Sequence, residues 1–223
     1  MKRDLINHLK KFVLQKRLEL FEEKIQQRTK HICLVLEDIY QGRNISASIR
    51  SADCFGVQDI HIIENSNNFE EDSEVSLGSE KWVSIYRHNT LKNNTLNSIN
   101  KLKKNGYQII GTTIYDEDIS LYDLNIDKKT ALIFGSEMNG CSNEILSLAD
   151  KKVKIPMYGF TESFNISVAV ALSLQHLTYK MRKSEHIKWK LNADDIDNIM
   201  LEWLKKTVKS SSLIEKRFIE KNK

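Results

Sequence analysis

Short apolar runs alternate with helical segments through the middle of the chain, and this alternation constrains the fold more than any other feature. The runs are rich in β-branched residues and are short enough to be buried strands. They are residues 32–36, 59–65, 79–88, 107–115, 130–137 and 151–157. Helical spacing follows most of them, at residues 44–56, 95–106, 143–150 and 165–184. Strands that alternate with helices indicate an α/β fold, with a mostly parallel sheet and helices on both faces.

The two ends of the chain differ from this middle part in pattern and in charge. Residues 4–28 have apolar positions at helical spacing, which predicts a helix or a helix pair, and the tail from Asn192 is helical again. Residues 1–30 hold nine Lys and Arg against four Asp and Glu, and residues 180–223 hold twelve against seven. We therefore predict a domain over 31–180, flanked by basic helical extensions over 1–30 and 181–223. The basic ends favour a polyanionic partner, although solvated lysine-rich helix faces would give the same count.

Several classes of protein are excluded by what the sequence lacks. No run approaches the roughly 18–20 apolar residues of a membrane span, and the charged N-terminus has no apolar signal-peptide core. Cys33, Cys54 and Cys141 are odd in number and lie in apolar settings, so we expect buried free thiols in a reducing cytoplasm. The six histidines show no ligand spacing, so no metal is implied.

Polar and small residues follow the predicted strands where a ligand site is expected. Ligands of open α/β sheets gather outside the carboxyl ends of the strands. The residues at these ends are Arg43, Asn44, Arg50, Thr112, Thr113, Gly135, Ser136, Glu137 and Gly140. Glu37 and Asp38 also end a strand, and for them a solvated turn is the simpler expectation. Structural roles remain open for the others too: a turn for the glycines, a surface position for Arg50 and a helix N-cap for Asn44.

Three motifs at these ends resemble the SPOUT class of RNA methyltransferases, and within it the SpoU/TrmH branch of ribose 2′-O-methyltransferases. The first is "NISASIR", which runs from Asn44 to Arg50. The second is "IFGSEMNG", a strand that enters a Gly-x-Glu-x-x-Gly loop. The third is "IPMYGFTESFNIS", with the only proline of the chain and a Ser-x-Asn-x-Ser pattern. The resemblance covers residues 31–180, and the motifs occur in the order of the family.

The resemblance implies a fold feature, a cofactor and a set of site residues. It implies a deep trefoil knot over about residues 130–180, and S-adenosylmethionine bound among the loops of the knot. Backbone around Thr112, Gly135, Ile155, Met157 and Phe164 would hold this cofactor, Phe164 standing where the family commonly has leucine. Arg50 would position the ribose and its phosphate and stabilise developing oxyanion charge, because an arginine is a poor base. Asn44 would orient Arg50 or the ribose, and Glu137, Ser163 and Asn165 would order the site around the knot and the substrate nucleotide.

The resemblance also implies a homodimer that acts on RNA, with no membrane partner and no DNA partner. The helical extensions and "SEKWV" look like the members that methylate guanosine 18 in the D-loop of tRNA, and this is the expected function. Ribosomal RNA 2′-O-methylation is the first alternative, and a non-catalytic RNA-binding module is the second. A dinucleotide-dependent oxidoreductase is disfavoured, because no GxGxxG pattern follows the first strand.

Overall fold

The computed structural model describes residues 1–70, 72–114 and 118–221, and these residues form two compact units. One unit comprises residues 29–189 and is called the sheet unit below. The other combines residues 1–28 with residues 190–223 and is called the helical unit. The two terminal segments, which the sequence presents as separate extensions, thus pack together as one body.

The sheet unit contains a seven-stranded sheet whose neighbouring strands are all parallel. The strands are β1 (Ile32–Glu37), β2 (Asp59–Ile63), β3 (Ser84–His88), β4 (Gln108–Thr112), β5 (Ile119–Ser120), β6 (Thr130–Phe134) and β7 (Lys151–Lys154). Their order is β3-β2-β1-β6-β4-β7-β5. The predicted parallel α/β sheet is confirmed. The strand predicted to reach Tyr115 ends at Thr112, and Tyr115 itself lies outside the described residues.

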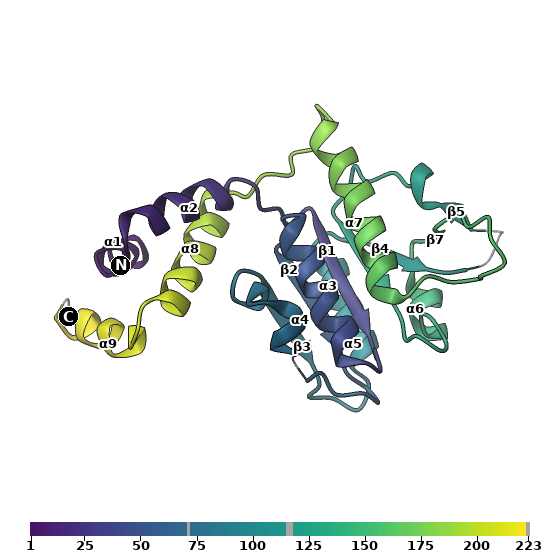
Figure 1. Cartoon of the computed structure of the whole chain (residues 1–223), viewed down its shortest axis with the longest axis horizontal. Helices are drawn as coiled ribbons and strands as arrows, with labels where there is room; N and C mark the ends of the chain where they lie inside the picture. The colour runs from purple at the N-terminus through teal and green to yellow at the C-terminus, as the bar shows by residue number, and fades with distance from the viewer. Residues whose placement is uncertain (71, 115–117, 222–223) are drawn as a thin grey trace. The chain divides into compact units, whose positions relative to one another are not determined.

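Helices cover both faces of this sheet. One face carries α3 (Gly42–Cys54), α4 (Ser73–Ser76), α7 (Ile166–Lys183) and the 3-10 turns η1 (Ser79–Lys81) and η2 (Leu121–Asp123). The opposite face carries α5 (Asn94–Lys104) and α6 (Asn143–Leu148). Figure 1 shows α3 and α7 side by side on their face, where they are in contact. A hydrophobic core lies on each face of the sheet, and successive residues of β1 point into the two cores in turn. Leu34 packs with α3 and α7, and Val35 packs with α5 and α6.

Several helices begin at a residue whose side chain accepts a backbone hydrogen bond. Asn93 caps α5, Ser142 caps α6 and Asn165 caps α7. The start of α3 is different, because its N-cap residue, Gln41, makes no such bond. The expectation that Asn44 could cap this helix is therefore wrong: the helix begins at Gly42, and Asn44 lies inside its first turn.

Two further expectations are corrected by burial. Cys33 and Cys141 are buried free thiols, but Cys54 is exposed, because it lies in the last turn of α3 on the side away from the sheet. Glu37 is not in a solvated turn: it is only 3% exposed and continues the buried strand β1.

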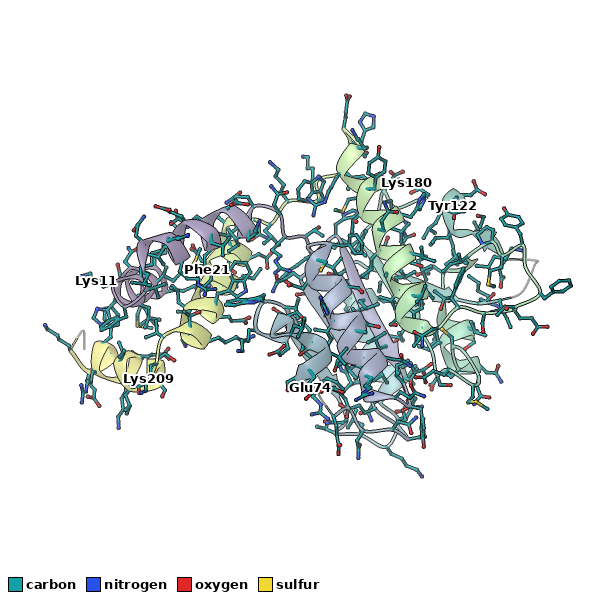
Figure 2. The ribbon with its side chains drawn as sticks, in the orientation of Figure 1. Lys11, Phe21, Glu74, Tyr122, Lys180 and Lys209 are labelled. Atoms are coloured by element: carbon teal, nitrogen blue, oxygen red, sulfur yellow. The ribbon has the colours of Figure 1, made fainter. Side chains whose placement is uncertain are left out.

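The helical unit contains α1 (Lys2–Lys10), α2 (Gln15–Ile25), α8 (Ala193–Thr207) and α9 (Ser211–Lys221). The predicted N-terminal helix pair is thus present. Phe21 of α2, labelled in Figure 2, packs edge-on against Trp203 of α8, with 5.4 Å between ring centroids. Both rings are buried. Lys2 and Arg3 pair with Asp194 and Asp197 across α1 and α8, each at 2.7 Å. In the part of the chain that the structure describes, no helix has the length and apolarity that crossing a membrane requires.

Candidate active site

The carboxyl ends of four adjacent strands bring the three motifs to one edge of the sheet. The order β1-β6-β4-β7 makes these strands neighbours, and all of them run in the same direction. The segments that follow them therefore converge, as expected for a ligand site in an open α/β sheet. They are the start of α3 after β1, the loop 135–142 after β6, and the segment 155–165 between β7 and α7.

The loop after β6 folds back on itself at its two glycines. Gly140 donates a backbone hydrogen bond to the carbonyl oxygen of Ser136, 2.9 Å away. A Cβ atom at Gly135 would overlap the carbonyl group of Gly140, so position 135 accepts no side chain without rearrangement of the loop. Gly140 itself has φ +64°, in the left-handed region that favours glycine. The glycines of the second motif thus shape the loop that presents Glu137.

Glu137, Asn44 and Asn165 form one hydrogen-bonded cluster, and each comes from a different motif. The Asn44 Nδ2 donates to Glu137 Oε1 at 2.7 Å. The Asn165 Nδ2 donates to Asn44 Oδ1 at 3.2 Å, while Asn165 Oδ1 caps α7 by accepting from the backbone N of Ser167 at 2.9 Å. The cluster ties the start of α3 to the loop after β6 and to the start of α7.

Glu137 also supplies the cap that Gln41 does not. Its carboxylate accepts from the backbone N of Tyr40 at 2.9 Å and from that of Gln41 at 3.3 Å, at the N-terminus of α3. Burial acts to raise the pKa of Glu137, but the hydrogen bonds from Asn44 and the two backbone N–H groups outweigh it, so the pKa is lowered. A charged carboxylate also interacts favourably with the positive end of the helix dipole.

Arg50 and Ser163 lie outside this cluster. Arg50 is exposed, and six residues separate it from Asn44, so the two side chains leave α3 in directions roughly 120° apart. Among residues 1–70, 72–114 and 118–221, the side chain of Arg50 makes no hydrogen bond or ion pair, and the same is true of the side chain of Ser163, which is also exposed. Both side chains are therefore accessible to a ligand or a partner.

Of the five residues expected to hold the cofactor, Thr112, Gly135 and Ile155 lie at the ends of β4, β6 and β7, while Met157 and Phe164 lie in the segment 155–165. The Thr112 hydroxyl donates to the carbonyl oxygen of Ile133 at 2.9 Å, which joins β4 to β6 beside Gly135. Ile155 packs against the core, Met157 is half-buried, and Phe164 is 43% exposed. Residues 155–164 make no backbone–backbone hydrogen bond to other described residues. Their N–H and C=O groups can therefore bind a small polar molecule at this edge.

Two carboxylates hold this edge together: Glu37, which is buried at the end of β1, and Asp38, which lies in the half-exposed bend that the sequence predicts. Glu37 accepts from the Thr95 hydroxyl at 2.8 Å and from the backbone N and hydroxyl of Ser142 at 3.0 and 2.8 Å, which fixes the far end of the loop 135–142. Asp38, with φ +49°, accepts from the backbone N of Asn65 at 2.7 Å and of Ser66 at 2.8 Å. The sequence contains a signal for the burial of Glu37, because this residue directly continues an apolar strand.

The described residues contain no group of three or more His, Cys, Asp or Glu side chains that could hold a metal ion. The edge presents hydrogen-bonding backbone groups, the bound carboxylate of Glu137 and the accessible guanidinium of Arg50.

Comparison with known proteins places the whole arrangement in one family. The model of the SpoU rRNA Methylase family matches residues 31–175. A tRNA (guanosine(18)-2'-O)-methyltransferase of Borreliella burgdorferi is 39% identical over 94% of both chains. The crystal structure of a TrmH/SpoU tRNA modifying enzyme of A. aeolicus is 28% identical, with a TM-score of 0.78 over 88% of this chain and 98% of that one.

The fold is shared more widely. The SpoU methyltransferase AviRb of Streptomyces viridochromogenes, solved in complex with AdoMet, is 22% identical, with a TM-score of 0.59 over 73% of this chain and 62% of that one. The family model spans the three motifs from Asn44 to Ser167, and the sheet unit that carries them has the fold of these structures. The chain belongs to the SpoU rRNA methylase family.

Proposed function

We propose that the protein transfers a methyl group from S-adenosylmethionine to the ribose 2′-oxygen of guanosine 18 in the D-loop of tRNA. The observation that carries this proposal is the Borreliella burgdorferi relative, whose name states this activity and whose similarity extends over 94% of the chain. The family model ends at residue 175, so this similarity also covers most of the helical unit. Because this chain is similar to that relative in both units, the similarity supports tRNA as its substrate as well.

The cofactor is S-adenosylmethionine in this proposal, and Thr112, Gly135, Ile155, Met157 and Phe164 bind it. The hydrogen-bonding groups of 155–164 suit its adenine and amino acid moieties, and the apolar side chains Ile155, Met157 and Phe164 suit the adenine faces. When bound, it supplies an activated methyl group on a sulfonium. The 2′-oxygen would bond to that methyl carbon as the carbon–sulfur bond breaks; S-adenosylhomocysteine would leave, and the hydroxyl proton would pass to water.

The chain's own residues act on the ribose and on its phosphate. Arg50 binds the phosphate and stabilises negative charge on the 2′-oxygen, a role that suits a permanently charged, accessible guanidinium. Asn44, Glu137 and Asn165 hold the start of α3 and the start of α7 against the loop 135–142. Ser163, exposed next to Phe164, contacts the substrate nucleotide.

Three finer features belong to the same proposal. The first is a trefoil knot over about residues 130–180, in which the chain after β7 passes the loop 135–142 before it enters α7. The second is a homodimer formed through α7, which presents Val168, Leu172 and Tyr179, each at least 43% exposed, along one side. The third is a cytoplasmic location, where tRNA is the accessible substrate.

The test is methyl transfer from labelled S-adenosylmethionine to unmodified tRNA and, separately, to ribosomal RNA, with nucleosides identified after digestion. We expect 2′-O-methylguanosine in tRNA alone, mapped to position 18. Label in ribosomal RNA alone would keep the chemistry and refute the substrate. Absence of label from both would refute the proposed activity.

A further inference from the structure

Arg43 is a charged strand-end residue, singled out in the sequence, that the proposed site does not use. It lies in the first turn of α3, and its side chain is 77% exposed. Seven residues separate it from Arg50, which is close to two full helical turns, so both guanidinium groups project from the same side of α3. Their positions on the helix are about 10.5 Å apart along its axis. Two long, flexible cationic side chains thus share one exposed stripe.

The position of Arg43 is electrostatically unfavourable in itself, and the carboxylates of Glu137 and Asp72 offset this at the same helix end. The N-terminus of a helix carries partial positive charge, so a cation in the first turn is destabilising there. The first turn of α3 contains no acidic residue. Among the residues that the structure describes, Arg43 makes a single ion pair, from its Nε to Asp72 Oδ2 at 3.0 Å.

Asp72 is the fixed member of this pair. Its backbone N donates to the buried Ser46 hydroxyl of α3 at 3.0 Å, and its Oδ1 caps α4 by accepting from the backbone N of Glu74 at 3.1 Å. The same segment also packs on the start of α3, because a Cβ at Gly42 would lie 2.6 Å from the carbonyl oxygen of Glu70. The Asp72 side chain is 23% exposed, far less than that of Arg43. A carboxylate that is tied to the backbone therefore pairs with an exposed guanidinium.

We propose that Arg43 is a second phosphate-binding residue of the RNA site, and that Asp72 holds it in the absence of RNA by taking the place of a phosphate. The inference rests on the proposed function, since it assigns Arg43 to the same RNA strand whose ribose Arg50 would contact. An exposed ion pair is weak in water, so a phosphate can displace the carboxylate at little cost. The fork of the guanidinium suits a phosphate as well as it suits a carboxylate.

Arg43 is a positioning residue in this proposal, so its removal should weaken RNA binding and spare the chemical step. For Arg43→Ala we expect the KM for an unmodified tRNA transcript to rise about tenfold, since a charged hydrogen bond is lost. The kcat should stay within about twofold, and the slope of log affinity against log salt should fall by about 0.7–0.9, the value for one phosphate contact. Arg43→Lys should restore most of the salt slope and only part of the affinity, because lysine keeps the charge and lacks the fork.

Asp72→Asn gives the opposite prediction, and this separates the proposal from a structural role. Asparagine keeps the cap on α4 but not the charge, so Arg43 is released and tRNA should bind about twofold to fivefold more tightly. The matched control is Glu74→Gln on the same short helix; Glu74 is labelled in Figure 2. This substitution removes one exposed negative charge that does not pair with Arg43. The effect of Asp72→Asn should exceed that of this control, and should vanish in an Arg43→Ala background.

The results that overturn the inference are distinct from those that overturn the proposed function. A wild-type protein that methylates tRNA, together with an Arg43→Ala variant of unchanged KM and salt slope, refutes the role of Arg43. Weaker tRNA binding by Asp72→Asn, or a gain equal to that of Glu74→Gln, refutes the competition between Asp72 and phosphate. Only the absence of methyl transfer by the wild-type protein counts against the proposed function itself.

Discussion

Glu137 should stabilise the sheet unit by capping α3, and Glu137→Gln tests this with almost no change of shape. The carboxylate accepts three hydrogen bonds: Oε1 from Asn44 and Gln41, and Oε2 from Tyr40. A glutamine can keep its one oxygen toward Asn44 and Gln41. Its NH2 group then faces the backbone N–H of Tyr40, so one hydrogen bond is lost and two donors oppose each other. The charge at the positive end of α3 is lost as well.

The expected cost follows from these two losses. A hydrogen bond to a charged group stabilises by about 1.5–3 kcal/mol, and a charge at a helix terminus by about 0.3–1 kcal/mol. Glu137 lies at the surface, where solvent screening reduces both values. We therefore expect the free energy of unfolding to fall by about 1–2 kcal/mol, and Tm to fall by roughly 2–8 °C for a chain of this size.

The assay is chemical and thermal unfolding of wild-type protein, Glu137→Gln and the control Glu162→Gln. Glu162 is exposed in the neighbouring segment and forms no hydrogen bond in the described parts of the chain, so its replacement should change little. Equal stability of Glu137→Gln and Glu162→Gln would refute the capping role. A loss in Glu137→Gln alone would support it.

The same variant predicts a pH dependence. The folded-state pKa of Glu137 lies below its ordinary value, so its contribution is complete above the unfolded pKa, near 4.3, and is lost as the pH falls through the folded pKa. The stability difference between wild type and Glu137→Gln should hold between about pH 5 and 7 and shrink below about pH 4. A difference that stayed constant down to pH 3 would assign the effect to packing and not to charge.

Three further predictions concern the reaction, the loop 135–142 and the helical unit. Arg50→Ala should lower the rate of methyl transfer to tRNA by at least about a hundredfold, as loss of an oxyanion donor does. Calorimetry should find S-adenosylmethionine binding within about twofold of wild type, and lost cofactor binding would contradict the role proposed for Arg50. In Gly135→Ala the new methyl group should overlap the Gly140 carbonyl, lower the free energy of unfolding by about 1–3 kcal/mol and weaken S-adenosylmethionine binding. A wild-type free energy of unfolding together with wild-type cofactor affinity would show that the loop can open. Lys11→Ala with Lys209→Ala, both at exposed positions of the helical unit (Figure 2), should weaken tRNA binding and reduce its salt slope by about 1–2, whereas unchanged binding would make these lysines an ordinary solvated surface.

Local pattern was sufficient for most of the secondary structure. The runs around Leu34, Ile62 and Leu132 are too short and too β-branched to be helices, and each lies in the buried sheet. Glycine marks the end of α3 at Gly56 and of α5 at Gly106, both with positive φ. The two-residue strand β5 was not predicted, because a strand of that length has no period to detect.

The sequence by itself determined the class of fold, the order of the elements and the three motifs, because strand and helix periods and turn residues are local properties of the chain. Only the tertiary structure decided which of those motif residues meet. Asn44 and Asn165 are 121 positions apart, and they touch because α3 and α7 lie side by side on one face of a parallel sheet. The same convergence assigned Glu137 to the cap that Gln41 lacks and brought the buried Glu37 against the end of the loop 135–142. Hydrogen bonds between distant segments depend on which strand ends become neighbours, and no local pattern encodes that order.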